Sequence, residues 1–407
     1  MKILFVCPYI PSLIRSRPYN LLRALAARGH DITLLALQPP SDAGESVEAL
    51  RKVCAAVHVI PHRRAQTLLN GLAALPGRTP LQAAYSRSAD FARKAQEIVA
   101  AGAFDAAHVE HLRGALLADA LGGLPVVFDS VDSIALLFEK VLKDAPTPKS
   151  RLLAALDLRR TQRFEGRLTA RFAQVAVTSA ADRAALVALG CDPERVTVVP
   201  NGVDLDYFQP LERLPRDPLR LVFTGKMSYH ANIAAVEDLA NVIMPLVWKH
   251  KPDANLQIVG KDPASVIQAL GQHPNIEVTG FVSDMRPYLA QAAVAVSTVR
   301  YGVGIQNKVL EAMAMATPVV CSPQASSALT AQPGRDLLLG ATPEAVAEQI
   351  VTLLGAPEQR ATLGAAGRRY VEANHTWDGA AARFERLYEQ AAAGTVHTQH
   401  SFFSDLS

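Results

Sequence analysis

Cysteine, long apolar runs and a signal peptide are all scarce or missing in this 407-residue sequence. Its four cysteines are widely spaced and form no C-x-x-C pair, so neither a zinc site nor a disulfide framework is indicated. No apolar run reaches the roughly 18 residues that a membrane-spanning helix needs. The apolar opening ends at Pro8, too early for a signal peptide. We therefore expect a cytoplasmic protein.

An excess of one charge is also missing. The formal net charge of +3 is too small to indicate nucleic acid as a partner. The most basic stretch runs from Lys149 to Arg171, where seven Lys and Arg residues stand against Asp157 and Glu165. The stretch from 149 to 171 is either a solvated helix face or a peripheral contact with anionic lipid at the inner face of the cell membrane.

Familiar cofactor and metal motifs do not occur. Gly302-x-Gly304 lacks the third glycine of a dinucleotide fingerprint, with Asn307 in its place, and no G-x-x-x-x-G-K-[ST] is present. The segment His108-Val-Glu-His111 lacks the H-E-x-x-H spacing, and no Asp-x-Asp offers a clamp for a divalent metal. We expect no metal and no nicotinamide or flavin cofactor.

The composition and pattern favour two α/β domains. Hydrophobic residues make up 49% of the chain, enough for full cores. Apolar strand patterns alternate with helical patterns before and after a turn-rich stretch at 200–218, which predicts two doubly wound, Rossmann-like domains in tandem. The expected strands are 2–7, 31–37, 56–60, 105–109, 126–129, 174–178, 196–199, 219–224, 255–259, 276–279, 294–298, 318–322 and 336–339.

These patterns also predict the domain boundaries. We expect a first domain at 1–215, a second at 216–376, a helix at 377–393 that packs back on the first domain, and a mobile tail at 394–407. Two doubly wound domains imply a ligand in the cleft between them, at the carboxyl ends of the strands.

Glu311 is the most informative single residue. It is the only formally charged residue between Val309 and Gly334, and a lone buried carboxylate costs several kcal/mol unless something hydrogen-bonds to it. Lys308, three residues earlier, shares its helix face. Loop amides near Gly304 and the helix N-terminus favour an anion. The segment thus predicts a site for phosphate beside vicinal hydroxyls, the two features of a nucleotide-sugar.

A second lysine follows the strand expected at 219–224. Gly225 lets the backbone turn sharply there, and Lys226 could meet a diphosphate as a point charge. The alternative is an ordinary exposed loop lysine. We expect Asn232 to cap the helix that follows.

Charged residues at strand ends of the first domain are candidates for acceptor binding. Two arginines near the first strand suit a phosphate or carboxylate across the cleft, or form a surface pair. Polar groups after the strands at 105–109 and 126–129 could orient an acceptor hydroxyl, although turn capping explains the aspartates equally well. The candidates are Arg15, Arg17, His108, Glu110, His111 and Asp129.

Four segments in this order resemble the retaining "group 1" glycosyltransferases of the GT-B fold. They are Val-Pro-Asn-Gly-Val-Asp-Leu-Asp-Tyr-Phe, Phe-Thr-Gly-Lys-Met, Lys-Val-Leu-Glu-Ala-Met-Ala-Met-Ala-Thr-Pro-Val-Val and His-Thr-Trp, and the resemblance spans about residues 1–392. It implies transfer of a sugar from a nucleoside-diphosphate-sugar to a glycan or lipid-linked acceptor, with retention and without metal.

The resemblance also assigns roles. The counterpart of Glu311 binds the donor ribose, and basic residues that match Lys226 and Lys308 bind the diphosphate. The donor-binding candidates are Gly225, Lys226, Gly302, Gly304, Asn307, Lys308 and Glu311, and the catalytic candidates are Lys226, Lys308 and His111. The segment Gly-Ile-Gln-Asn-Lys-Val-Leu-Glu is similar to a sub-branch linked to bacterial exopolysaccharide and PEP-CTERM loci.

The sequence departs from the family pattern at two places. Val303 stands where the family has a second glutamate that touches the donor sugar, and Ile14-Arg-Ser-Arg17 replaces a glycine pair. Two alternatives therefore stay open. One is a nucleotide-sugar epimerase or hydrolase on the same fold, and the other is a nucleotide-sugar-binding protein that has lost catalysis.

Overall fold

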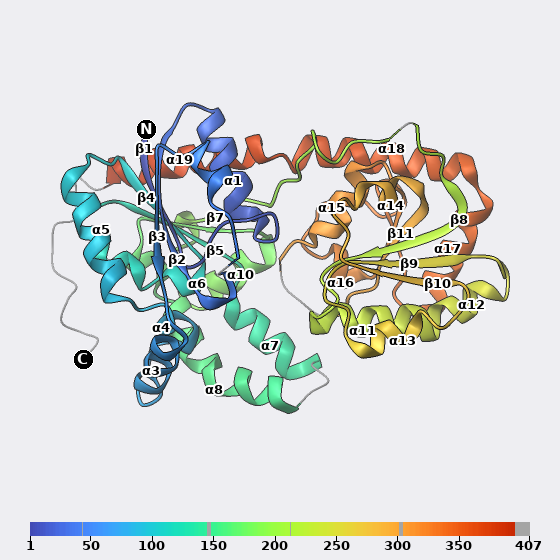
Figure 1. Cartoon of the computed structure of the whole chain (residues 1–407), viewed down its shortest axis with the longest axis horizontal. Helices are drawn as coiled ribbons and strands as arrows, with labels where there is room; N and C mark the ends of the chain where they lie inside the picture. Colours follow the sequence, from blue (N-terminus) through green and yellow to red (C-terminus); the bar gives the residue numbers. More distant parts are fainter. Residues whose placement is uncertain (43, 145–147, 212, 301–303, 395–407) are drawn as a thin grey trace. The chain divides into compact units, whose positions relative to one another are not determined.

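The chain forms two compact units in a computed structural model that describes residues 1–394 apart from 43, 145–147, 212 and 301–303 (Figure 1). Unit 1 comprises Met1–Pro200 and the chain from Trp377, and unit 2 comprises Asn201–Thr376. The division falls after Pro200, not after residue 215 as predicted, because the turn-rich stretch bonds within unit 2: Val203 N donates to His375 O at 2.9 Å. The tail predicted at 394–407 lies almost entirely outside the described residues.

Unit 1 is built on a seven-stranded parallel sheet with the order β3-β2-β1-β4-β5-β6-β7. The strands are β1 (Lys2–Cys7), β2 (Asp31–Gln38), β3 (Ala56–Pro61), β4 (Ala106–Glu110), β5 (Val126–Val131), β6 (Gln174–Val177) and β7 (Val196–Val198). The helices are α1 (Ser16–Ala27), α2 (Glu48–Arg51), α3 (Arg64–Ala74), α4 (Leu81–Ala84), α5 (Ala89–Ala101), α6 (His111–Gly114), α7 (Ile134–Asp144), α8 (Pro148–Glu165), α9 (Leu168–Arg171), α10 (Ala180–Ala188) and α19 (Trp377–Gly394).

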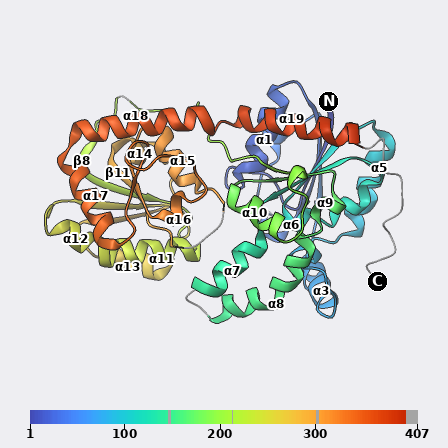
Figure 2. The ribbon, with the colours of Figure 1, turned by 180° about the vertical axis from the view of Figure 1, so that it is seen from behind.

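Side chains of β1 alternate between two cores, one on each face of this sheet. Ile3, Phe5 and Cys7 pack with α1 and α19, whereas Leu4 and Val6 pack on the opposite face. Because both faces are buried, the strands are continuous apolar runs, which is why they are visible in the sequence. The last helix, α19, therefore belongs to the core of unit 1 (Figure 2).

Unit 2 repeats the architecture with a six-stranded parallel sheet of order β10-β9-β8-β11-β12-β13. Its strands are β8 (Asp217–Thr224), β9 (Asn255–Val259), β10 (Ile276–Gly280), β11 (Ala292–Ser297), β12 (Val319–Cys321) and β13 (Leu338–Leu339). Its helices are α11 (His230–Asp238), η4 (Leu239–Ile243), α12 (Met244–Trp248), α13 (Ser265–Leu270), α14 (Arg286–Gln291), α15 (Asn307–Ala314), α16 (Pro323–Ser326), α17 (Pro343–Gly355) and α18 (Pro357–Asn374).

One helical stretch of unit 2 meets a test for membrane spans by its mean hydropathy, although Glu237 and Asp238 interrupt it and it is not an unbroken apolar run. Residues His230–Trp248 pass that test by length and composition. Half of the stretch is buried, however, and Leu239, Ile243 and Met244 lie in the hydrophobic core of unit 2. We therefore interpret the stretch as a helix of the hydrophobic core of unit 2.

Candidate functional site

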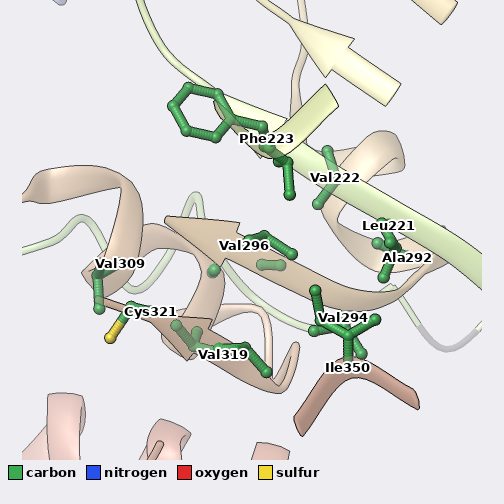
Figure 3. Close-up of a cluster of buried hydrophobic side chains, with 14 of the residues drawn as sticks. Leu221, Val222, Phe223, Ala292, Val294, Val296, Val309, Val319, Cys321 and Ile350 are labelled. Atoms are coloured by element: carbon green, nitrogen blue, oxygen red, sulfur yellow. The ribbon is translucent and has the colours of Figure 1, made fainter. Parts of the chain in front are cut away.

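The predicted donor residues gather at the point in unit 2 where the strand order reverses. The chain leaves β8 toward β9 on one side and leaves β11 toward β12 on the other. Ligands of doubly wound sheets bind at such a point, outside the carboxyl ends of the strands. Helix α15 follows β11 here, and its Val309 belongs to the same buried apolar cluster as the side chains of β8, β11 and β12 in Figure 3, where it lies next to Cys321. This packing fixes where Lys308 and Glu311 lie.

Gly225 leaves room where β8 ends. Its φ of +152° is a backbone conformation that residues with a side chain rarely adopt. A Cβ at this position would lie 2.8 Å from Asn232 Nδ2 and 3.2 Å from Lys308 Nζ. A Cβ at Gly260, in the neighbouring loop, would lie 1.7 Å from Gly225 O. The two glycines therefore let the loops and the lysine approach closely, and Gly260 was not predicted as part of the site.

Lys308 is held in position by two contacts. Its Nζ donates to Asn232 Oδ1 at 2.5 Å and lies 4.3 Å from the centre of the Phe223 ring. Burial lowers the pKa of Lys308 to about 7, while Glu311 acts in the opposite direction. The expectation that Asn232 caps the helix is wrong: Asn232 lies inside α11, and its amide donates to Lys226 O at 2.9 Å. Asn232 instead links the two lysine-bearing segments.

Glu311 has no donor among the described residues. It lies one turn after Lys308 on α15 and is partly exposed. Within the described part of the chain no group donates a hydrogen bond to its carboxylate, and no ion pair within 4.0 Å reaches it. Burial raises the pKa of Glu311 to about 7, and the charge of Lys308 opposes this rise. A carboxylate in this setting can accept hydrogen bonds from the hydroxyls of a ligand.

The remaining donor candidates differ in how well they are placed. Lys226 is 52% exposed and lies 3.9 Å from Asp262, which is 57% exposed, so its ammonium group remains accessible. Asn307 accepts a hydrogen bond from Asn201 Nδ2 at 3.1 Å. Gly304 has a φ of +69°, which favours glycine. Gly302, like Val303, lies outside the described residues.

The corresponding point in unit 1 is filled by the protein itself. Arg17 is 5% exposed and forms a two-pronged ion pair with Asp129, with distances of 2.7 and 3.0 Å. Arg15 pairs with Asp42 at 2.7 Å and stacks on the Tyr9 ring at 4.0 Å. Arg17 is therefore neither open to a phosphate nor part of a surface pair, and its buried partner could not be predicted because Asp129 lies 112 positions away in the sequence. Arg15 keeps 26% of its side chain exposed, so its predicted role in acceptor binding stays a prediction.

His108 and Glu110 are buried next to this ion pair. Glu110 accepts hydrogen bonds from Tyr9 OH at 2.8 Å and Cys7 Sγ at 3.3 Å, and burial raises its pKa to about 8. His108 Nδ1 lies 2.9 Å from Tyr388 OH of α19, and burial lowers the pKa of His108 to about 4. Both residues are at most 1% exposed. They are part of the interior of unit 1 and, contrary to the expectation, do not line an open acceptor surface.

His111, the catalytic candidate of unit 1, lies at the start of α6. It is partly exposed, has a φ of +63°, and accepts a hydrogen bond at Nδ1 from Arg113 N at 3.2 Å. Burial lowers its pKa to about 3, so the ring is neutral at pH 7. Among the described residues, no group of three or more His, Cys, Asp or Glu residues is arranged to hold a metal ion.

Solved structures share this fold over the whole chain. A sucrose-phosphate synthase from Thermosynechococcus elongatus aligns with a TM-score of 0.71 at 19% identity, covering 97% of this chain and 100% of the other. Anabaena HepE in complex with UDP aligns with a TM-score of 0.64 at 15% identity, covering 96% and 100%. The fold is therefore that of the two-domain α/β glycosyltransferases, the GT-B class.

Two family models narrow this class. Residues 17–207 match the model described as "Glycosyltransferase Family 4", and residues 218–356 match "Glycosyl transferases group 1". The chain belongs to the glycosyltransferases that these two models describe.

Among curated proteins, the chain is 29% identical over 53% of its length to an MMP alpha-(1->4)-mannosyltransferase of Mycolicibacterium hassiacum. It is 31% identical over 44% of its length to a GDP-mannose-dependent phosphatidylinositol monomannoside mannosyltransferase of Corynebacterium glutamicum. The matched part spans about half of each relative, 54% and 52%.

Proposed function

We propose that this chain transfers a sugar from a nucleoside-diphosphate-sugar to a hydroxyl group of a glycan or a lipid-linked acceptor, with retention of the anomeric configuration and without a metal. The single observation that carries the proposal is the pair Lys308 and Glu311 at the strand reversal of unit 2. There a positioned ammonium group lies one helical turn from a carboxylate that has no donor among the described residues. This pair matches a diphosphate beside sugar hydroxyls.

The proposed mechanism relies on positively charged groups that are in position before the sugar is transferred. As the bond between the sugar and the diphosphate breaks, negative charge grows on the departing diphosphate. Lys308 and Lys226 stabilise this charge, together with backbone amides near Gly304. A bound diphosphate also favours the charged form of Lys308 and raises its pKa again, because an anion close by stabilises the ammonium group. Glu311 orients the ribose by accepting hydrogen bonds from its hydroxyls.

The relatives support the donor and the acceptor classes. A structural neighbour was crystallised with UDP, and one curated relative is named as GDP-mannose-dependent and acts on an acylated inositol lipid. For this chain we propose a nucleoside-diphosphate-hexose donor. We also propose a cytoplasmic location at the inner face of the cell membrane, where the basic stretch 149–171 contacts anionic lipid, and a role in polysaccharide biosynthesis.

Product analysis tests the proposal against the alternatives. The chain is incubated with UDP-, GDP- and ADP-sugars, with and without extracted lipid or glycan acceptors, and the products are followed by NMR of the anomeric proton. We expect a new glycosidic bond with the donor's anomeric configuration only when acceptor is present. Release of free sugar whether or not acceptor is present would indicate a hydrolase. Conversion of the donor to an isomer would indicate an epimerase. Tight binding of the donor without any product would indicate a protein that has lost catalysis.

A further inference from the structure

Helix α3 of unit 1 turns an apolar stripe toward solvent. Leu68, Leu69 and Leu72 are 68%, 61% and 63% exposed, and Leu75, at the end of the helix, is 48% exposed. At 3.6 residues per turn, Arg64, Leu68, Leu72 and Leu75 fall on one side of the helix. A surface helix normally turns such a stripe to the core, but the only buried residue of α3 is Ala74.

Helix α8 carries a similar exposed stripe. Leu152 and Leu156 are 61% and 55% exposed, and the helical period places exposed Arg159 and Arg163 on the same side. Two leucines are thus followed by two arginines along one face. We call the exposed leucines of α3 and α8 (Leu68, Leu69, Leu72, Leu75, Leu152 and Leu156) the leucine face.

The acidic residues of α8 are turned away from this face. Asp157 is 3% exposed, and both of its carboxylate oxygens accept from Leu81 N at 3.0 Å. Glu165 is fully buried and accepts from Ser133 Oγ at 2.8 Å and Ile134 N at 2.7 Å. The exposed charges of α8 among its described side chains are therefore all basic. Around α3, residues 61–89 include four arginines and no carboxylate.

Helices α3 and α8 are neighbours in the fold. The Arg160 guanidinium of α8 donates to Leu75 O at the end of α3. The bond from Leu81 N to Asp157 ties α8 to the segment that follows α3. Figures 1 and 2 show both helices at the same end of unit 1. The exposed leucines and arginines of the two helices therefore lie close together at one end of unit 1.

We propose that the leucine face docks unit 1 on an anionic lipid surface, with the leucines inserted into the apolar layer and the arginines at the headgroups. Exposed leucines beside exclusively basic charge are the features by which a helix binds an anionic bilayer interface. This inference deepens the membrane contact of the proposed function, because it adds an inserted apolar element on α3 to the basic stretch 149–171. Sugar transfer itself does not depend on it.

A second copy of this chain is a poorer occupant of the leucine face. In a two-fold symmetric dimer the same patch meets itself, so the arginines of one copy would lie against the arginines of the other. Like charges brought together in this way oppose association. Charge complementarity thus favours anionic lipid.

Vesicle sedimentation of the full chain tests this inference. We expect the wild-type chain to sediment with vesicles of phosphatidylglycerol and phosphatidylcholine but not with phosphatidylcholine alone. The double variant Leu68→Gln/Leu72→Gln should lower the partition coefficient at least roughly tenfold, because two apolar side chains no longer enter the bilayer. Phe281→Gln is the matched control: Phe281 is 74% exposed in unit 2 and lies outside the leucine face, so its loss should change nothing.

A fluorescence readout does not depend on removing the leucines. The variant Leu72→Trp should show a blue shift of tryptophan emission with anionic vesicles. We expect no such shift from the wild-type chain, because Trp248 and Trp377 lie outside the leucine face. Unchanged sedimentation of the leucine variant, or no shift from Leu72→Trp, overturns the inference. The inference is also overturned if the wild-type chain does not bind vesicles but forms a concentration-dependent dimer that is lost in the leucine variant. If vesicle binding fails while transfer to a water-soluble acceptor persists, this inference falls and the proposed transfer stands.

Discussion

Lys308 is the residue on which the proposed chemistry depends most. Its Nζ is fixed by Asn232 and by the Phe223 ring, so it can stabilise charge without reorganisation. We predict that Lys308→Ala lowers kcat about 100-fold or more and leaves the unfolding temperature almost unchanged. Lys249→Ala, at an exposed lysine of the same unit, serves as the control and should retain full turnover. Near-normal turnover of Lys308→Ala would remove Lys308 from the mechanism.

Glu110 makes the stability of unit 1 depend on pH. Burial raises its pKa from an ordinary value of 4.5 to about 8. Between about pH 4.5 and pH 8 the folded chain holds a proton on Glu110 that the unfolded chain releases. The free energy of unfolding therefore falls as pH rises through this range and levels off above about pH 8. The slope from this one group is at most about 1.4 kcal/mol per pH unit.

The variant Glu110→Gln removes this titration. In urea unfolding between pH 5 and pH 9, the variant should gain stability relative to the wild-type chain as pH rises toward 8. A difference between the two proteins that stays constant with pH would show that Glu110 is not protonated in the folded chain.

At the level of elements, helix α19 is joined to unit 1 by both apolar and polar contacts. Phe384 and Tyr388 are fully buried against β1 and β4, and Arg28 of the α1 end pairs with Glu385 at 2.7 Å. Tyr388 OH also lies 2.9 Å from His108 Nδ1. The other ring nitrogen of His108 has no hydrogen-bond partner among the described residues. The hydroxyl is thus the main polar anchor of a buried imidazole.

Removing that hydroxyl should therefore be costly. We predict that Tyr388→Phe lowers the free energy of unfolding by about 1–3 kcal/mol, because it leaves a buried polar atom without a partner. Tyr207→Phe is the comparison, since Tyr207 OH bonds to Asp284 at 3.2 Å on the exposed surface, where water can replace it. Equal effects of the two substitutions in urea unfolding would contradict the anchoring role of Tyr388.

The strands of both sheets could be predicted from the sequence, whereas the contacts between elements could not. Every expected strand overlaps an observed one, because strands buried on both faces are uninterrupted apolar runs. The ion pair of Arg17 with Asp129 joins residues 112 positions apart, and no local sequence pattern indicates it. The link from Lys308 to Asn232 spans 76 positions and was missed for the same reason. The candidates on α15 could be predicted because Lys308 and Glu311 in an otherwise apolar helix are a local signal.

Over the whole molecule, the two sheets share the order of their first six strands but differ at the point where that order reverses. In unit 1 this point is filled by Arg17, Asp129 and Glu110, which pair with groups of the same unit. In unit 2 it presents Lys308 and Glu311 beside the two loops that contain Gly225 and Gly260. We therefore expect each chain to bind a single nucleoside diphosphate, in unit 2.

Binding should raise the stability of the folded chain. A ligand at 100 times its dissociation constant that binds only the folded state adds about 2.7 kcal/mol. We predict that one of UDP, GDP and ADP raises the unfolding temperature by several degrees, and that the same nucleotide does so for Glu110→Gln. No shift with any of the three would contradict a nucleotide site.

The most direct test of the central claim is a calorimetric titration of the stabilising nucleoside diphosphate into the wild-type chain and into Lys308→Ala. The account predicts one site per wild-type chain and a dissociation constant at least roughly tenfold higher in the variant, the loss expected for one charge-assisted hydrogen bond to phosphate. An equal dissociation constant in both proteins, or no binding to the wild-type chain, would contradict it.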